Sequence, residues 1–362
     1  MALKIVRGKN LPIGLDLGSS RVKMVQLRQT DQDCELVAAD WAQVPPECRA
    51  DARQRMRFLG GAIRKLLATN KFLGNRCILS LPAEATFLQH VKVPKLPPDQ
   101  TASAVLQELE GKLPYPPAEA VIRQITAGDV FGDGEAKQEV IVVAVSRAVL
   151  EAYLSMATHA KLDVVGVNIE PCAIVECFAR VFRRANDAAT ATLFVDMGAS
   201  STQVVLGLGN RMAFARNLAA GGDRIDQVVA EGMHVSAEQA RAVRQDLLGE
   251  TGDPAARDEL YHLLEGTIRS IGDEMTQCLR YYESIFRDSS VGRAIFVGGQ
   301  AYDKRLCQAI AQRLNLPAQI GDPLVRVRRA EGAGANVGLD WRQPQPAWAV
   351  AVGLSLGAVL AA

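Results

Sequence analysis

Histidine and paired cysteine are scarce in this chain of 362 residues. It has four histidines, and its seven cysteines are scattered, with no Cys-x-x-Cys pair among them. This usage argues against a structural zinc site and against a disulfide framework. It favours a reducing compartment, so the sequence predicts a cytoplasmic location.

A surplus of either charge is also missing. Lys and Arg number 41, Asp and Glu number 40, and the formal net charge is +1. No block of basic residues alternates with aromatic ones, which is the pattern of a nucleic-acid surface. The composition therefore predicts no nucleic-acid partner.

Long hydrophobic runs are absent at the N-terminus, where the chain reaches Asp16 before any such run could form a secretory signal. The segment from Ala347 to Ala362 has no charge, but it is shorter than the roughly 20 residues that a spanning helix needs. We expect a closely packed buried helix there and no direct membrane span.

The chain does contain one local sequence pattern in two copies. Each copy is an apolar strand, then Asp-x-Gly with small hydroxyl residues, then a second apolar strand, and a duplication would explain the pair. Such a sequence favours a tight hairpin with an almost bare tip. The copies are Ile13-Gly14-Leu15-Asp16-Leu17-Gly18-Ser19-Ser20 and Phe194-Val195-Asp196-Met197-Gly198-Ala199-Ser200-Ser201.

Tips of this kind suit phosphate. Glycine lets backbone N–H groups approach anionic oxygens, Ser hydroxyls add donors, and an Asp can hold a water of hydrated Mg²⁺. Lys23 lies one strand from the first tip and is either a phosphate contact or a solvated strand lysine. Gly298 and Gly299, between a strand and a helix, suit an approaching base or anion. The alternative is a pair of ordinary turns rich in Asp and Gly.

The rest of the sequence has the pattern of an α/β fold. The length of the whole chain suits about two domains. The composition changes near Ala83, where several prolines follow, and this predicts a small inserted α+β unit that contains a loop over 128–134. Farther on, apolar residues at helical steps predict a long helix over 258–286, which Gly266 and Gly272 interrupt.

The order of these motifs resembles the actin/Hsp70 ATPase superfamily and, within it, the type IV pilus assembly protein PilM family, which is related to the cell-division protein FtsA. The likeness covers nearly the whole chain. It is carried by Ile13 to Lys23, Val93-Pro94-Lys95-Leu96-Pro97, Leu113-Pro114-Tyr115-Pro116-Pro117, Asn168-Ile169-Glu170-Pro171 and Ala349-Val350-Ala351-Val352-Gly353-Leu354.

The resemblance implies an α/β fold of the actin-like (RNase H-like) type, with two lobes and an inserted α+β subdomain. The boundaries it implies are 1–82, 166–187 and 345–362 for the first lobe (1A), 83–165 for the inserted subdomain (1C), 188–222 and 288–344 for the second lobe (2A), and 223–287 for a helical subdomain (2B).

It also implies ATP and Mg as cofactors, with Asp16 and Asp196 holding the hydrated ion from opposite sides. Glu170 would orient the attacking water, the alternative being an acid at a helix N-terminus. The implied phosphate contacts are Gly18, Ser19, Ser20, Lys23, Gly198, Ser200 and Ser201, and the implied ribose and adenine contacts are Gly221, Gly222, Gly298 and Gly299.

One departure from the family pattern concerns the nucleotide. Relatives commonly have Ala-Glu-x-x-Lys after the Gly-Gly turn, whereas this chain has Arg241 and Arg244 at the two charged positions. A ribose-accepting carboxylate is thus replaced by a group without an acceptor. Arg241 either meets a phosphate or faces solvent, and Arg244 replaces the lysine charge.

The resemblance implies an actin-like, ATP-binding adaptor of a type IV pilus or type II secretion platform, with slow or absent hydrolysis. It would lie at the inner membrane through a bitopic partner, whose PilN-like N-terminal peptide binds between the first lobe and the inserted subdomain. The alternatives are a self-associating, FtsA-like filament former and a small-molecule kinase of the same superfamily.

Overall fold

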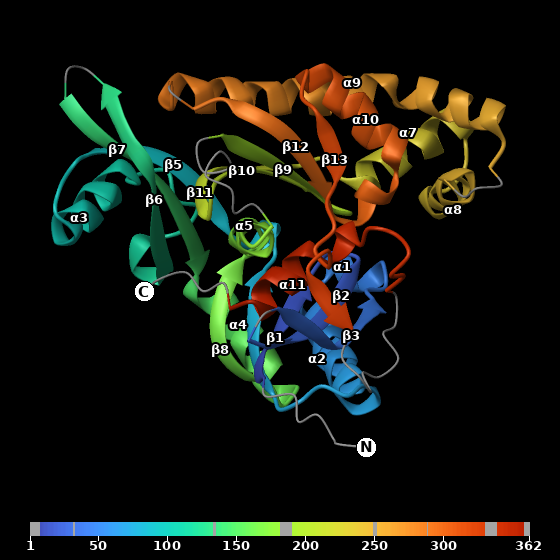
Figure 1. Cartoon of the computed structure of the whole chain (residues 1–362), viewed down its shortest axis with the longest axis horizontal. Helices are drawn as coiled ribbons and strands as arrows, with labels where there is room; N and C mark the ends of the chain where they lie inside the picture. The colour runs from blue at the N-terminus through green and yellow to red at the C-terminus, as the bar shows by residue number, and fades with distance from the viewer. Residues whose placement is uncertain are drawn as a thin grey trace.

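The computed structural model describes residues 8–31, 33–132, 135–181, 190–248, 252–287, 289–329 and 339–357. The predicted boundary at 187/188 and the last residues of the uncharged C-terminal segment lie outside these ranges. Two sheets stand one above the other, and the helices α5 (Glu170–Ala179) and α11 (Ala349–Ser355) lie between them (Figure 1).

The first sheet has the strand order β14-β3-β2-β1-β4-β8. β1, β2 and β3 form an antiparallel meander, and β4 and β8 add parallel to β1. The strands are β1 (Lys9–Leu17), β2 (Arg21–Gln29), β3 (Cys34–Gln43), β4 (Arg76–Leu81), β8 (Asp163–Ile169) and β14 (Val327–Arg329). β14 comes from the range expected in the second lobe, yet it pairs with β3.

The second sheet repeats this plan in the order β11-β10-β9-β12-β13. Its first three strands are again antiparallel neighbours, and β12 and β13 again add in parallel. The strands are β9 (Ala191–Met197), β10 (Thr202–Leu208), β11 (Arg211–Leu218), β12 (Val291–Val297) and β13 (Ala318–Ile320). The twofold motif in the sequence thus corresponds to a twofold sheet topology.

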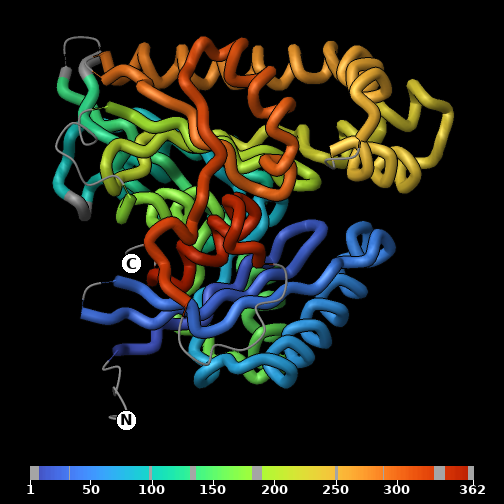
Figure 2. Tube along the Cα trace, turned by 45° about the vertical axis from the view of Figure 1, so that its right-hand side comes forward, coloured from blue at the N-terminus to red at the C-terminus, as the bar shows by residue number. Residues whose placement is uncertain are grey.

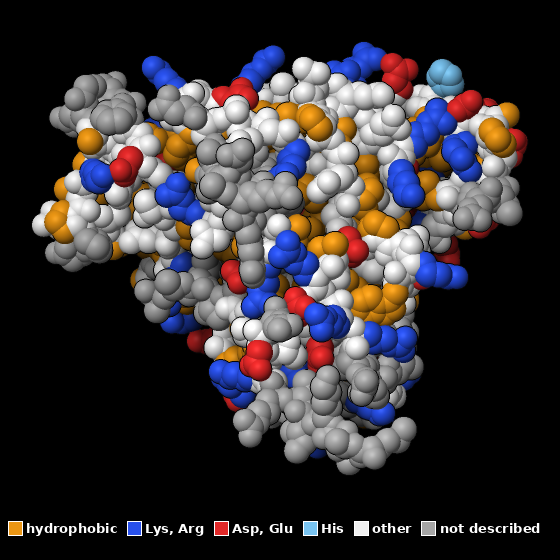
Figure 3. Space-filling view, viewed as in Figure 1, with side chains coloured by type: hydrophobic (Ala, Val, Ile, Leu, Met, Phe, Trp, Pro, Cys, Tyr) orange, Lys and Arg blue, Asp and Glu red, His pale blue; other side chains and the backbone are white. Residues whose placement is uncertain are grey.

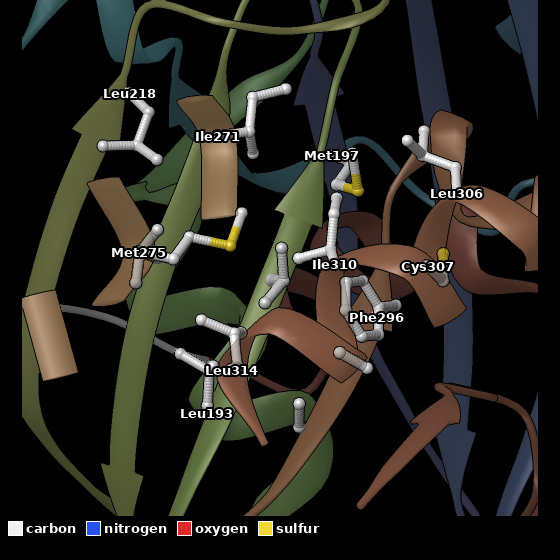
Figure 4. Close-up of a cluster of buried hydrophobic side chains, with 14 of the residues drawn as sticks. Leu193, Met197, Leu218, Ile271, Met275, Phe296, Leu306, Cys307, Ile310 and Leu314 are labelled. Atoms are coloured by element: carbon white, nitrogen blue, oxygen red, sulfur yellow. The ribbon is translucent and has the colours of Figure 1, made fainter. Parts of the chain in front are cut away.

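Helices cover the second sheet and enclose its core. Figure 4 shows Leu193 and Phe296 of the sheet meeting Ile271 and Met275 of α9 and Ile310 of α10. The helices are α7 (Gly222–Met233), α8 (Ala237–Leu248), α9 (Pro254–Ile285) and α10 (Lys304–Leu314). α9 confirms the long helix predicted over 258–286, and the short 3-10 turn η3 (Gly299–Tyr302) precedes α10.

The first lobe has its own core, in which Leu59 and Ile63 of α2 (Ala52–Thr69) pack with Tyr153 and Met156 of α4 (Arg147–His159). α4 comes from the range expected in the inserted subdomain, yet it packs against the first lobe. The short helix α1 (Glu47–Ala50) precedes α2. Asp51 caps α2, because its side chain accepts hydrogen bonds from the backbone N–H groups of Arg53 and Gln54.

The region predicted as an insertion contains a third sheet, in the order β5-β7-β6, with α3 (Pro98–Glu108) beside it. Its strands are β5 (Phe87–Pro94), β6 (Ala120–Gly132) and β7 (Glu135–Ser146). The loop predicted over 128–134 is wrong for 128–132, because β6 absorbs Gly128 at a register shift and continues pairing to Gly132.

Two glycines let α11 lie deep between the lobes. A side-chain carbon at Gly353 would overlap the carbonyl of Ala173 in α5, and one at Gly14 would overlap the carbonyl of Ala351. The C-terminal segment runs between the two lobes (Figure 2). The buried helix expected near the C-terminus is therefore confirmed over 349–355.

The surface mixes charges of both signs. On the face seen in Figure 3, hydrophobic side chains form small separate patches among Lys, Arg, Asp and Glu. No helix in the described ranges is both long and apolar enough to cross a bilayer.

Candidate functional site

The two predicted hairpins exist, and their tips line one cleft. β1 and β2 pair up to Leu17 and Val22, and β9 and β10 pair up to Met197 and Thr202. In each case only four residues remain for the tip, which suits a Gly followed by small hydroxyl residues. Both tips and the starts of α5, α7 and η3 meet at the cleft.

Most of the predicted site residues line this cleft. From the first lobe they are Asp16, Gly18, Ser19, Ser20, Lys23 and Glu170; from the second they are Asp196, Gly198, Ser200, Ser201, Gly222, Arg241, Arg244, Gly298 and Gly299. Gly221 is not among the lining residues. It lies behind the second tip, where a side-chain carbon would meet the carbonyl of Ala199 at 2.5 Å.

Carboxylates from both lobes are crowded at the centre of the cleft. Burial and the charge of Asp16 raise the pKa of Asp196 to about 6, although Lys23 opposes the shift. Burial, followed by repulsion from Asp196 and Asp16, raises the pKa of Glu170 well above its usual range. These shifts show that three acids from facing elements share one electrostatic environment.

Two of these acids have defined partners. Lys23 Nζ lies 2.8 Å from Asp16 Oδ2, so the lysine side chain forms an ion pair inside the cleft and does not extend into solvent. Gln203 Nε2 donates to Glu170 Oε2 at 2.9 Å. Glu170 is the first residue of α5, the helix that lies between the lobes.

Arg241 and Arg244 both form ion pairs with acids of α7. Arg241 donates to Asp226 at 2.7 Å and to Asp223 at 2.7 Å. Arg244 donates to Asp226 as well and to Gln300 Oε1 at 2.9 Å. Both guanidinium groups therefore brace α8 against α7 along one wall of the cleft.

The same network continues across the cleft to the first lobe. Arg49 of α1 donates to the two carboxylate oxygens of Asp223 at 3.1 and 3.4 Å. Its Nε and Nη2 atoms are buried without a hydrogen-bond partner among the described residues. Buried guanidinium donors without acceptors are costly, so the two N–H groups of Arg49 are available to donate to an acceptor on a ligand.

Several residues of the cleft were not found from the sequence. Arg49, Asp223, Asp226, Gln203 and Gln300 lie in stretches that read as ordinary helix or strand. Each is separated from its partner by many positions along the chain, and no local pattern signals such a pairing. The described residues hold no cluster of three or more His, Cys, Asp or Glu arranged as direct metal ligands.

Solved structures give the fold class. The chain is similar to a chain of a PilM-PilN type IV pilus biogenesis complex, with 21% identity over 96% of this chain and 98% of that one and a TM-score of 0.78. It is also similar to the ethanolamine utilization protein EutJ of Carboxydothermus hydrogenoformans (13% identity, 96% and 89% covered, TM-score 0.54) and to MreB5 of Spiroplasma citri bound to ADP (12%, 95% and 94%, 0.51). The molecule is an actin-like protein of two lobes.

The family follows from the sequence itself. The model of the type IV pilus assembly protein PilM family matches residues 14–359, which is nearly the whole chain. No curated protein sequence matches it. The chain belongs to the PilM family of type IV pilus assembly proteins.

Proposed function

We propose that the chain is a nucleotide-binding adaptor of a type IV pilus assembly platform and that it binds ATP in the cleft between its lobes. The observation that carries this proposal is the meeting of two Gly-Ser tips with three carboxylates in one cleft. Ser20 and Ser201 supply hydroxyl donors, and the glycines allow backbone amides to approach phosphate oxygens. Gly222, Gly298 and Gly299 border the nucleoside.

The acids fit a hydrated Mg²⁺ that accompanies the phosphates. Such an ion keeps most of its waters and needs only one or two carboxylates, so the absence of a direct ligand cluster in the described ranges is no obstacle. Burial is the main cause of the raised pKa of Asp196, and a cation in the cleft would favour its charged form. Asp16 and Asp196 would hold the hydrated ion through its waters, and the ion would neutralise charge on the phosphates.

Hydrolysis is slow or absent in this proposal. Glu170 is the residue that positions a water near the phosphates, and Gln203 holds its carboxyl group at 2.9 Å. Burial and the charges of Asp196 and Asp16 raise the pKa of Glu170 and so disfavour the carboxylate, the form that accepts a proton from water. We therefore infer a binding role for the nucleotide and not rapid turnover.

The adaptor role needs a second site for a membrane partner. A groove borders the cleft where the end of β4, the edge strand β5 of the inserted sheet and the edge strand β11 of the second sheet come together. It is lined by apolar residues such as Leu81 and Phe87 and by the polar Gln277. Edge strands beside a groove can receive an extended peptide. We assign it to the cytoplasmic N-terminal peptide of a bitopic, PilN-like inner-membrane protein, which would hold the chain at that membrane.

Titration calorimetry with Mg·ATP tests the nucleotide site. The wild type is expected to bind, and Asp16→Ala is expected to lose at least tenfold in affinity because the metal and Lys23 both lose a partner. No heat of binding with the wild type would refute nucleotide binding. Phosphate release above about one per minute without a partner, or transfer to a small molecule, would favour the kinase alternative.

Peptide binding is tested by fluorescence anisotropy with the labelled N-terminal peptide of the partner. Gln277→Trp fills the groove and is expected to abolish binding. Glu283→Trp changes an exposed position on the same helix that does not line the groove, and it is expected to bind as the wild type does. Equal affinities for the two variants would place the peptide elsewhere.

A further inference from the structure

Arg55 lies behind the first tip and reaches its backbone. It is in the first turn of α2 and only 6% of its surface is exposed. Its Nη2 donates to the carbonyl of Leu17 at 2.9 Å and to that of Gly18 at 3.2 Å, and its Nη1 donates to that of Ser19 at 3.5 Å. One guanidinium group thus donates hydrogen bonds to three consecutive carbonyls of the tip.

This arrangement fixes which way the amides of the tip point. The structure has no cis peptide bond among the described residues, and in a trans peptide the N–H points opposite to the carbonyl of the preceding residue. The N–H groups of Gly18, Ser19 and Ser20 therefore point away from Arg55. Those three residues line the cleft.

The second tip achieves the same result with backbone alone. There the N–H of Gly222 donates to the carbonyl of Gly198 at 3.0 Å, and the N–H of Asp223 donates to that of Ala199 at 2.8 Å. These two donors belong to the first turn of α7, which begins directly behind the tip. At the first tip the corresponding donors come from the side chain of Arg55, in the first turn of α2.

A guanidinium suits this task better than other side chains. It presents five donors in a rigid fork, whereas an ammonium is a compact point donor. The carboxylate of Glu84 lies 3.9 Å from Arg55, a loose contact for an ion pair. The carbonyls of the tip lie closer to the side chain than Glu84 does, and without Arg55 they would lose this donor.

We propose that Arg55 is a positioning residue for the phosphate site: by holding three carbonyls of the first tip it aims the amides of Gly18, Ser19 and Ser20 at the anion. The inference rests on the proposed nucleotide site for its ligand, a phosphate group of ATP. Its effect on the backbone is independent of any ligand.

Amide nitrogen relaxation of the full chain without nucleotide tests the backbone effect. In Arg55→Lys, which keeps the charge but loses the fork, the order parameters of the amides of residues 18–20 are expected to fall from a rigid value of about 0.85 to below about 0.6, while those of residues 198–201 are unchanged. Arg57→Ala, at an exposed position on the same helix, is the matched control and is expected to match the wild type. Equal order parameters for the first tip in Arg55→Lys and the wild type overturn the proposal.

Calorimetry with Mg·ATP tests the consequence for binding. Arg55→Lys is expected to lose at least tenfold in affinity with its urea midpoint close to that of the wild type, and Arg57→Ala is expected to lose nothing. An unchanged affinity in Arg55→Lys overturns the role in binding. If the wild type itself does not bind Mg·ATP, the proposed function fails, and the relaxation experiment still decides whether Arg55 orders the tip.

Discussion

At the residue scale, the cleft holds acids that are more costly when charged than they would be in water. Burial and Asp16 raise the pKa of Asp196 to about 6, so the folded chain retains this proton to a higher pH than the unfolded chain does. Active sites commonly carry such perturbed groups, and the cost is compensated when a ligand binds.

The pH dependence of stability follows from that shift. Because the native state binds more protons between about pH 4 and 6, the free energy of unfolding falls as the pH rises through this range. Asp196→Asn cannot ionise, so at pH 7 it is expected to be more stable than the wild type, and the difference should shrink at pH 5. Urea denaturation in the presence of EDTA at both pH values measures this. Parallel pH curves for the two proteins would contradict it.

Individual residues were predictable where a local pattern carried the chemistry. The Asp-x-Gly-x-Ser segments predict that Asp16, Asp196 and their glycines share one cleft, and these residues do line a single cleft. Arg55 and Arg49 were not predictable, because their partners are backbone carbonyls or acids that only the fold brings near. A departure from the family pattern at Arg241 was visible, but not its ion pair with Asp226.

At the element scale, glycine has opposite effects in two helices. Gly266 lies in the middle of α9 with no atom within 4 Å of an added side-chain carbon, whereas at Gly353 of α11 that carbon would overlap the backbone of α5. Conformational freedom is a cost in the first case and close packing is the reason for glycine in the second.

These two positions give a paired prediction. Gly266→Ala is expected to raise the free energy of unfolding by about 0.5–1 kcal/mol, since alanine favours the helix and meets nothing. Gly353→Ala is expected to lower it by about 1–3 kcal/mol, because α11 must move away from α5. Urea titrations of both variants beside the wild type test this, and a loss at Gly266 or no loss at Gly353 would be the contrary result.

Elements with a strong period were predictable, and edges were not. The apolar steps that predicted a long helix correspond to α9, although Gly266 and Gly272 interrupt them. In contrast, β6 continues through Gly128 because its register with β7 shifts there and pairing outweighs the local preference of Gly and Asp for a loop. Short edge strands such as β14 depend on a partner that is distant in sequence.

At the scale of the whole molecule, the cleft between the lobes and the groove assigned to the peptide share a wall. Glu170 and Gln203 line both, and the hydrogen bond between them lies at that wall. Because a ligand shifts a structure only through contacts that differ between its states, this shared pair is where the two sites would influence each other.

The coupling can be measured with the labelled peptide. Saturating Mg·ATP is expected to change the peptide affinity of the wild type severalfold, and Gln203→Ala is expected to bring the ratio close to one. Gln312→Ala, at an exposed position of α10 outside both sites, serves as the control. A ratio in Gln203→Ala equal to that of the wild type would mean that the wall does not transmit the effect.

The duplicated architecture was the most predictable property at this scale, because two copies of one hairpin motif indicate two similar sheets. The way the lobes are joined was not. It depends on Gly14 and Gly353 admitting α11 and on the contact of Arg49 with Asp223, which are matters of packing and not of local pattern.

The central claim is that Asp16 and Asp196, from different lobes, act on the same metal-bound nucleotide. A double-mutant cycle of Asp16→Asn and Asp196→Asn, with Mg·ATP affinity measured by calorimetry, tests it most directly. Residues that share one ligand are expected to be coupled, so the double variant should lose at least about 1 kcal/mol less than the sum of the single losses. Additive losses, or no effect of one of the two substitutions, would contradict the claim.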